Sequence, residues 1–250
     1  MNISIDDIVP IFFTDKDDIF IQYNKHLFLE NSYYMPYPCN IHKVLSELPI
    51  YDLDPLQGPA ISLISGRSQL TENGENIAIV LRRILSNTET SRQFFNYIKH
   101  VLPFVEDIAV ERLLDKHLQI KVREQYAPNE FLPASLMSNG SVTLISIIIA
   151  LFFENKKISI FEEPGGRVHP YLISKIIDMM KDASESMQIF LTTHNPEIVK
   201  YAGLSNIFYL LRDKDGYSVI SHISNKEEIA EFMKNEIGLE ELFVQNLLSK

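Results

Sequence analysis

Two adjacent glutamates end one of the most apolar short segments of the chain. The run Ile158–Phe161 has the composition of a buried strand, and Glu162 and Glu163 follow it directly. In open α/β sheets, ligands bind at the carboxyl ends of the strands. Two carboxylates at that place can divide the chemistry, because Glu162 can hold Mg²⁺ through its water shell and Glu163 can act as general base toward an attacking water. Taken alone, the pair could equally be two solvated acids at a strand end.

A histidine follows the next apolar segment. The run Gln188–Thr192 is predicted to be a second buried strand, and His194 lies two residues beyond it. If the two strands are neighbours, His194 lies beside Glu163, where an imidazole could contact a terminal phosphate. A lone histidine at a strand end is more often structural, but its place after a second buried strand favours a functional role.

Small polar residues precede the most apolar helix. Ser138, Asn139, Gly140 and Ser141 come directly before Val142–Phe153. Backbone N–H groups at such a helix start can hold a phosphate. The plainer interpretation is an N-cap by Asn139 or Ser141.

After Pro133, short apolar strands alternate with helices along the chain. This order is typical of a parallel sheet covered on both faces. A second helix is predicted over Pro170–Ala183, between the two strands. Ile207–Leu211 and Tyr217–Ser221 flank an Asp-Gly turn and are predicted to form a hairpin. Two amphipathic helices are expected near residues 226–234 and 239–249.

The part of the chain before Pro133 has a different pattern of apolar and polar residues. Asn73–His100 carries the periodicity of two amphipathic helices, and the alternation in Leu118–Arg123 predicts a half-buried strand. We therefore expect three regions: a β-rich part at 1–61, a helical and β lobe at 62–133, and a region at 134–250 that carries the three segments described above.

The order of these segments resembles the C-terminal half of ABC-type ATPase heads of the SMC/RecF kind. Among these, it is most similar to predicted bacterial AAA-type ATPases related to the overcoming-lysogeny-defect group. That family has a signature S-D-G-T where this chain has Ser138–Ser141, a Walker B end E-E-P-E where it has Glu162–Gly165, and T-T-H-S-P-E where it has Thr192–Glu197. An H-P pair, here His169-Pro170, lies between the last two, and the likeness runs from roughly Tyr51 to the end.

The resemblance implies an α/β fold: the C-terminal part of a P-loop NTPase head, with a parallel sheet flanked by helices and an inserted helical lobe. It implies ATP and Mg²⁺ as cofactors, with Glu162 assisting the metal, Glu163 as catalytic base and His194 at the γ-phosphate. In such heads the nucleotide lies between two protomers. Ser138, Asn139, Gly140 and Ser141 would therefore contact ATP held by a partner, and hydrolysis would be coupled to opening of a dimer.

The sequence departs from this family in one major respect. It contains no phosphate loop G-x-x-x-x-G-K-[ST], since none of its nine glycines is followed by lysine. We expect that loop to come from a further N-terminal segment or from a partner subunit that carries it. Asn139 and Gly165 also replace acids of the family pattern, and Gly165-Gly166 predicts a flexible loop. The alternative is therefore a non-catalytic interaction module derived from an ATPase.

Composition and short motifs argue against several other functions and locations of the protein. A formal net charge of -10 gives little support to nucleic-acid binding. The single cysteine suggests a reducing compartment, by default the cytoplasm, and the longest apolar run is too short to cross a bilayer. A nuclease using Asp213 and Asp215 is disfavoured because a hairpin turn explains them. A metal hydrolase using the two glutamates with His169 and His194 is less favoured still.

Overall fold

The computed structural model describes residues 11–13, 18–20, 48–53, 61–64, 66–113, 116–166, 168–203, 206–212, 214–222 and 244. The chain divides into two compact units, Met1–Pro49 and Ile50–Lys250. In the first, β1 (Ile11–Phe13) and β2 (Asp18–Phe20) pair in antiparallel fashion. All other elements belong to the second unit.

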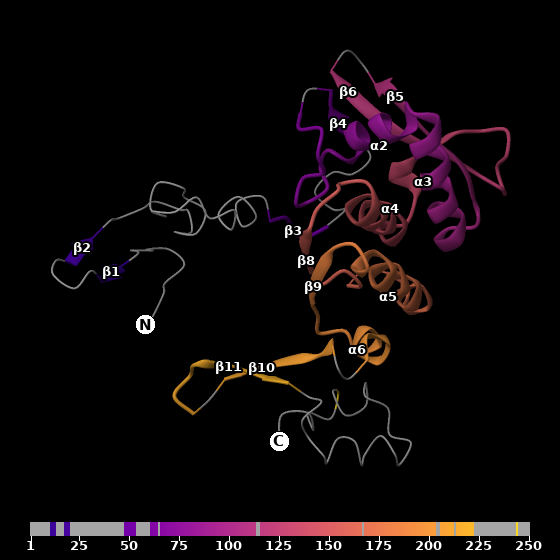
Figure 1. Ribbon diagram of the computed structural model, residues 1–250. Helices are drawn as coiled ribbons and strands as arrows, with labels where there is room; N and C mark the ends of the chain where they lie inside the picture. The colour runs from indigo at the N-terminus through magenta and orange to yellow at the C-terminus, as the bar shows by residue number, and fades with distance from the viewer. Residues whose placement is uncertain are drawn as a thin grey trace. The chain divides into compact units, whose positions relative to one another are not determined.

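Three parallel strands form the sheet that carries the candidate chemistry. They are β3 (Ile50–Tyr51), β8 (Ile158–Glu162) and β9 (Gln188–Thr192), in the order β3-β8-β9 (Figure 1). The predicted strands at β8 and β9 are confirmed, and the two are neighbours. The expectation that β9 is a buried strand was wrong, because its residues are exposed or only partly covered. Strand β3 was not predicted, because two residues are too few to show a period.

Helices cover one face of this sheet. The helix α4 (Asn139–Phe152) precedes β8, α5 (Pro170–Ser184) connects β8 to β9, and α6 (Pro196–Ala202) follows β9. In β8, Ser159 and Phe161 are buried, whereas the alternate residues are only partly covered. Cover was expected on both faces; in the described part of the chain, the helices lie against one of them (Figure 1).

The helix α4 is the centre of the core. Every residue from Ser141 to Leu151 is buried, which is the pattern of a helix surrounded by protein rather than facing water. Aromatic contacts join it to the lobe: Tyr97 stacks on Phe152 with ring centroids 4.0 Å apart. Arg83 donates to the buried carboxylate of Glu154 at 3.0 Å, just beyond the C-terminal end of α4.

The lobe combines two helices with an antiparallel sheet. Its helices are α2 (Ile77–Leu85) and α3 (Thr88–Val101), the pair predicted over 73–100. They are separated where the Asn87 side chain accepts hydrogen bonds from Glu89 and Thr90 N–H groups and so caps α3. The sheet contains β4 (Ile61–Leu63), β5 (Val105–Leu113), β6 (His117–Glu124) and β7 (Leu132–Pro133), with β6 between β4 and β5 and paired also with β7. A short 3₁₀ turn, η4 (Ala134–Leu136), leads from β7 toward α4.

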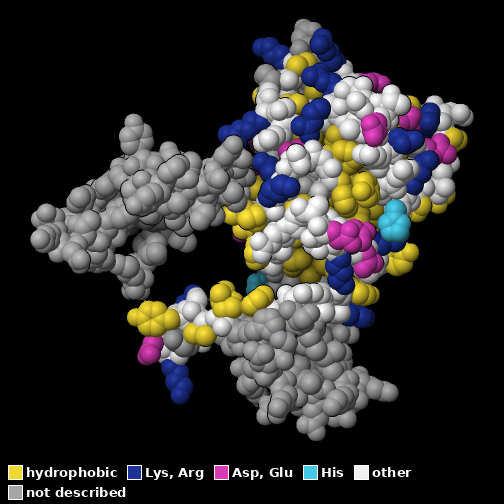
Figure 2. Space-filling view, viewed as in Figure 1, with side chains coloured by type: hydrophobic (Ala, Val, Ile, Leu, Met, Phe, Trp, Pro, Cys, Tyr) yellow, Lys and Arg dark blue, Asp and Glu magenta, His cyan; other side chains and the backbone are white. Residues whose placement is uncertain are grey.

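The predicted hairpin near the end of the chain is confirmed. β10 (Phe208–Arg212) and β11 (Ser218–His222) pair in antiparallel fashion, and Gly216 supplies the turn with a φ of 86°. Hydrophobic side chains lie along this hairpin on its exposed surface (Figure 2). The two helices expected near 226–234 and 239–249 lie outside the described residues. Among the residues that the structure describes, no helix is long and apolar enough to span a membrane.

Candidate functional site

The two glutamates lie where the sequence placed them, at the carboxyl end of β8. Glu162 is the last residue of the strand and is in register with Thr192. Glu163 donates its N–H to the Thr192 carbonyl at 3.1 Å and then leaves the strand with a φ of 43°. This left-handed conformation is uncommon for a residue with a side chain. It marks a sharp turn, closed by the Gly166 N–H, which donates to the Glu163 carbonyl at 3.0 Å.

The segment after β9 holds the Glu163 carboxylate. The backbone N–H of His194 donates to Oε1 at 2.7 Å, and the Thr193 hydroxyl donates to Oε2 at 3.2 Å. The Thr193 hydroxyl in turn accepts from the Asn195 N–H at 2.9 Å. The structure thus brings Glu163 and His194 together, as expected, but through the His194 backbone. The imidazole itself is exposed.

A cavity of about 180 Å³ opens beside the acids. Among the lining residues that were assigned no role from the sequence are Asp52, which follows β3, and Thr143, which lies in the second turn of α4. Asp52 lies at the start of the part of the chain that resembles the family, but β3 was not recognised as a strand. The full lining is Tyr51, Asp52, Leu53, Thr143, Phe161, Glu162, Glu163, Pro164 and Gly166.

The cavity lining suits the magnesium ion of Mg²⁺-ATP but not its triphosphate. Mg²⁺ prefers oxygen ligands and is usually held by one or two carboxylates together with water and substrate phosphates. Asp52, Glu162 and Glu163 offer such oxygens, although no group of three metal-binding side chains is close enough to form a complete site among the described residues. The triphosphate does not fit these residues by themselves, because no lysine or arginine is in the lining.

The segment Ser138–Ser141 acts locally as the start of α4. The Ser138 hydroxyl accepts from the Ser141 N–H at 3.2 Å, and the two hydroxyl oxygens are 2.9 Å apart. The prediction that Asn139 or Ser141 caps this helix was therefore wrong, because Ser138 is the cap. Ser138 and Asn139 are exposed, and none of the four residues, Gly140 included, lines the cavity.

The remaining residues of interest have structural positions. His169 caps α5, with Nδ1 accepting from the Tyr171 N–H at 3.3 Å, and it does not line the cavity. Gly165 is buried, and a Cβ there would lie 2.9 Å from Cδ1 of Ile198 in α6. A side chain at Gly165 would thus require Ile198 to shift, which shows a closely packed position where the sequence suggested a flexible loop.

Comparisons with known proteins place this geometry in context. Residues 41–200 match the family described as "AAA domain, putative AbiEii toxin, Type IV TA system". No curated protein matches the sequence. A structure from work on ATP-driven dimerization and DNA-stimulated activation of SMC ATPases is 16% identical, with a TM-score of 0.47, and the alignment covers 65% of this chain and 97% of that one.

Two further structures are similar in the same way. The SMC head domain from Thermotoga maritima is 17% identical with a TM-score of 0.42, and the alignment covers 60% of this chain and 50% of that one. The protein cbiO1 from Clostridium perfringens, part of an ABC transporter complex, is 16% identical with a TM-score of 0.43. The alignment covers 87% of this chain and 72% of that one. At these identities nothing about function follows. The fold itself is that predicted: an α/β fold of the P-loop NTPase head type, with a parallel sheet flanked by helices.

Proposed function

The chain belongs to the family described as "AAA domain, putative AbiEii toxin, Type IV TA system", and we propose that it is an ABC-type ATPase head in which Glu163 is the general base. One observation carries this proposal. The Glu163 carboxylate is fixed by two donors from the turn after β9, at the carboxyl end of a parallel sheet. That is where α/β folds bind and process their ligands.

The two hydrogen bonds leave Glu163 able to act on water. Each carboxylate oxygen has two lone-pair directions, and the Thr193 hydroxyl and the His194 N–H use one on each oxygen. The free directions can accept a proton from a water on the cavity side. A positioned base of this kind contributes about 10²- to 10⁴-fold to a rate.

Neighbouring acids would hold the metal. Mg²⁺-ATP supplies the phosphoanhydride bond that is cleaved and the cation that neutralises its phosphates. Glu162, assisted by Asp52 from the same cavity lining, would hold Mg²⁺ through oxygen ligands and bound water. The exposed His194 imidazole would contact the terminal phosphate.

Two parts of the proposed site must come from outside the cavity. The phosphates need a glycine-rich loop with a lysine, which these 250 residues do not contain. The exposed Ser138 and Asn139, with Gly140 and Ser141, would face ATP held by the second protomer of a homodimer. The cation-free lining favours a second candidate function, an interaction module that does not bind ATP.

The test measures ATP binding and turnover in four conditions. Mg²⁺-ATP is titrated by calorimetry into the chain and into Glu163→Gln, each with and without a separate polypeptide that carries the strand, phosphate loop and helix of an ATPase from the same family. We expect binding only with that polypeptide. Turnover should fall by about 10²-fold or more in Glu163→Gln, because the base is lost while the size and shape of the side chain are kept.

Controls separate the possible outcomes. Glu130→Gln removes an exposed carboxylate that lies outside the cavity and should leave turnover unchanged. With ATP bound and not hydrolysed, Glu163→Gln should also accumulate as a dimer in size-exclusion chromatography. Turnover equal to that of the unmodified chain would exclude Glu163 as base. Absence of ATP binding in every condition would leave the interaction module.

A further inference from the structure

One buried amide organises the loop that precedes α2. The Asn76 side chain is buried, and its Nδ2 group donates to the carbonyls of Arg67 at 2.8 Å and Gln69 at 2.6 Å. Its Oδ1 atom accepts from the backbone N–H of Thr71 at 2.9 Å and from the Thr71 hydroxyl at 3.1 Å. Both donors and both acceptor positions of the amide are therefore used. A carboxylate of the same size would keep the acceptors and lose the donors.

Asn76 does not use its side chain in the way that its position favours. It is the N-cap residue of α2, where an asparagine side chain usually accepts from N–H groups of the first helical turn. The Asn76 side chain makes no such bond, because it is directed back to the loop. Ile77 and Ala78, which follow it in α2, are wholly buried and fix its place. The amide therefore serves the loop rather than the helix.

The same loop holds the end of β3. The Glu72 carbonyl accepts from the Asp52 N–H at 3.0 Å. Gly74 has a φ of 73°, and a Cβ there would lie 3.4 Å from Cδ2 of Leu53. The loop is closed between these contacts, since the Gly74 N–H donates to the Thr71 carbonyl at 2.9 Å. The loop that Asn76 organises therefore contacts both residues that follow β3.

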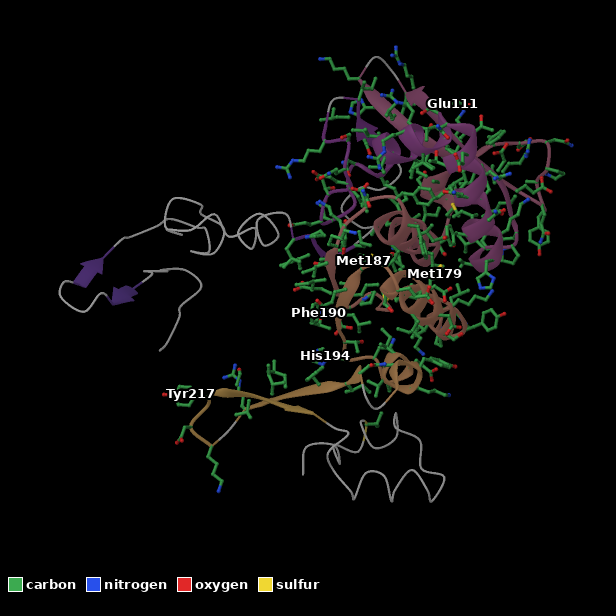
Figure 3. All side chains as sticks on the ribbon, in the orientation of Figure 1. Glu111, Met179, Met187, Phe190, His194 and Tyr217 are labelled. Atoms are coloured by element: carbon green, nitrogen blue, oxygen red, sulfur yellow. The ribbon has the colours of Figure 1, made fainter. Side chains whose placement is uncertain are left out.

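Asp52 is held differently from the other acids of the cavity. Glu162 is the last residue of β8 and is in register with β9, and the Glu163 carboxylate accepts from Thr193 and His194. That turn lies at the β9 edge of the three-stranded sheet, whereas the lobe lies toward β3 at the opposite edge (Figure 3). β3 has only two residues, so the loop before α2 supplies the hydrogen bond that fixes the Asp52 backbone.

We propose that Asn76 is a positioning residue for Asp52. Its amide closes the loop on Thr71, and the loop sets the Glu72 carbonyl. That carbonyl fixes the backbone from which the Asp52 side chain reaches the cavity. Groups that orient a metal ligand change metal affinity about 10- to 100-fold when they are substituted. The inference rests on the proposed function, because it deepens the role given to Asp52 at the Mg²⁺ site.

The first measurement needs no nucleotide. Hydrogen exchange resolved to single residues is compared between the whole chain and Asn76→Asp, which keeps the acceptor oxygens and loses both donors. We expect the Asp52 amide to exchange about tenfold or more faster in the variant, because the loop that carries its acceptor opens locally. The Glu163 amide, which donates to the Thr192 carbonyl, is the reference and should change little. Equal acceleration of the two amides, or no acceleration at Asp52, would overturn the proposal.

A milder pair of variants covers the case in which Asn76→Asp fails to fold. Thr71→Val removes the hydroxyl that bonds to Asn73 and Asn76, and it leaves the Thr71 N–H in place. We expect a smaller change at the Asp52 amide in the same direction, whereas Thr71→Ser keeps the hydroxyl and should match the unmodified chain. Asn87→Ala, which removes the cap of α3 in the same lobe, is the control. An effect of Asn87→Ala on Asp52, relative to the reference amide, as large as that of Thr71→Val would contradict the proposal.

The second measurement follows the metal. Turnover is measured against Mg²⁺ concentration at saturating ATP, with the phosphate-loop polypeptide present, for Asp52→Asn, Asn76→Asp and the double variant. We expect each single variant to raise the Mg²⁺ concentration for half-maximal turnover about tenfold. The double variant should need no more Mg²⁺ than Asp52→Asn, because Asn76 acts through Asp52. Asn87→Ala should leave the Mg²⁺ dependence unchanged. Additive effects of the two substitutions would overturn the proposal.

The outcomes separate this inference from the proposed function. Faster exchange confined to the Asp52 amide in Asn76→Asp, without ATP turnover in any condition, would support the positioning role and refute the ATPase. Turnover whose Mg²⁺ dependence responds to Asp52→Asn and not to Asn76→Asp would support the ATPase and refute the positioning role.

Discussion

Glu163 combines an unfavourable backbone with a favourable side chain. Its φ of 43° lies in the left-handed region, which costs a residue with a Cβ about 1 kcal/mol or more. Its carboxylate accepts from Thr193 and His194, and hydrogen bonds to charged groups contribute about 1.5 to 3 kcal/mol each. Glu163 is exposed, so solvent reduces the contributions of both hydrogen bonds. The turn after β9 thus favours the strained conformation.

Tyr51 is the residue whose ionisation should affect stability. It is 1% exposed, and its hydroxyl has no hydrogen-bond partner among the described residues. Burial, followed by the charges of Glu154 and Glu72, raises the pKa of the Tyr51 hydroxyl well above its usual value. The native state thus keeps a proton that the unfolded chain loses near pH 10. Stability from this group is complete below that pH and is lost as the pH rises further.

We therefore predict that Tyr51→Phe protects the protein in alkali. At pH 7 the free energy of unfolding should change by less than about 1 kcal/mol, because an unpaired hydroxyl is removed. At pH 11 the variant should be more stable than the unmodified chain by about 1.4 kcal/mol. Urea unfolding at both pH values measures this, with Tyr126→Phe as an exposed control. The same pH dependence in both variants would contradict the prediction.

Among the elements, long periodic ones could be predicted from the sequence and short ones could not. The apolar runs of α4, β8 and β9 predicted those elements nearly to their ends, since continuous apolar segments mark the elements that pack against the core. β3 and β7 have two residues each and exist through their partners, which no local pattern records. For the same reason Asp52 was not assigned to the site. The three domain boundaries stay a prediction.

The link between α2 and α4 gives a prediction at this scale. Arg83 of α2 donates to Glu154, whose side chain is fully buried, and also to the Phe153 carbonyl at 3.3 Å. Arg83→Met would leave a buried carboxylate without its cation. We expect a loss of about 2 kcal/mol in the free energy of unfolding, less than for a wholly buried pair because Arg83 is 42% exposed.

Its control is the neighbouring residue. Arg82→Met alters an exposed arginine on the same helix and should change the free energy of unfolding by less than about 0.5 kcal/mol. Adding Glu154→Gln to Arg83→Met should restore part of the loss, because the unpaired charge is removed. Equal losses for the two arginines in urea unfolding would show that the ion pair does not stabilise the chain.

For the whole molecule, charge is the property with the clearest consequence. A formal net charge of -10 repels the phosphate backbone of nucleic acids, and the cavity is itself lined by acids and by no lysine or arginine. We predict no binding of duplex DNA tighter than about 10⁻⁴ M at physiological salt, the weak end of non-specific affinity. Fluorescence anisotropy of a labelled duplex at two salt concentrations measures this. Tight binding that weakens steeply with salt would reveal a local basic surface.

The packing of Gly165 against Ile198 has a mechanical consequence. The loop after β8 contacts α6 at Gly165, where an added Cβ would lie 2.9 Å from Cδ1 of Ile198, and the Glu163 carboxylate accepts from the His194 N–H in the turn that leads into α6. The loop and the turn are thus joined at two places. A displacement of the turn between β9 and α6 would therefore also disturb the position of the Glu163 carboxylate.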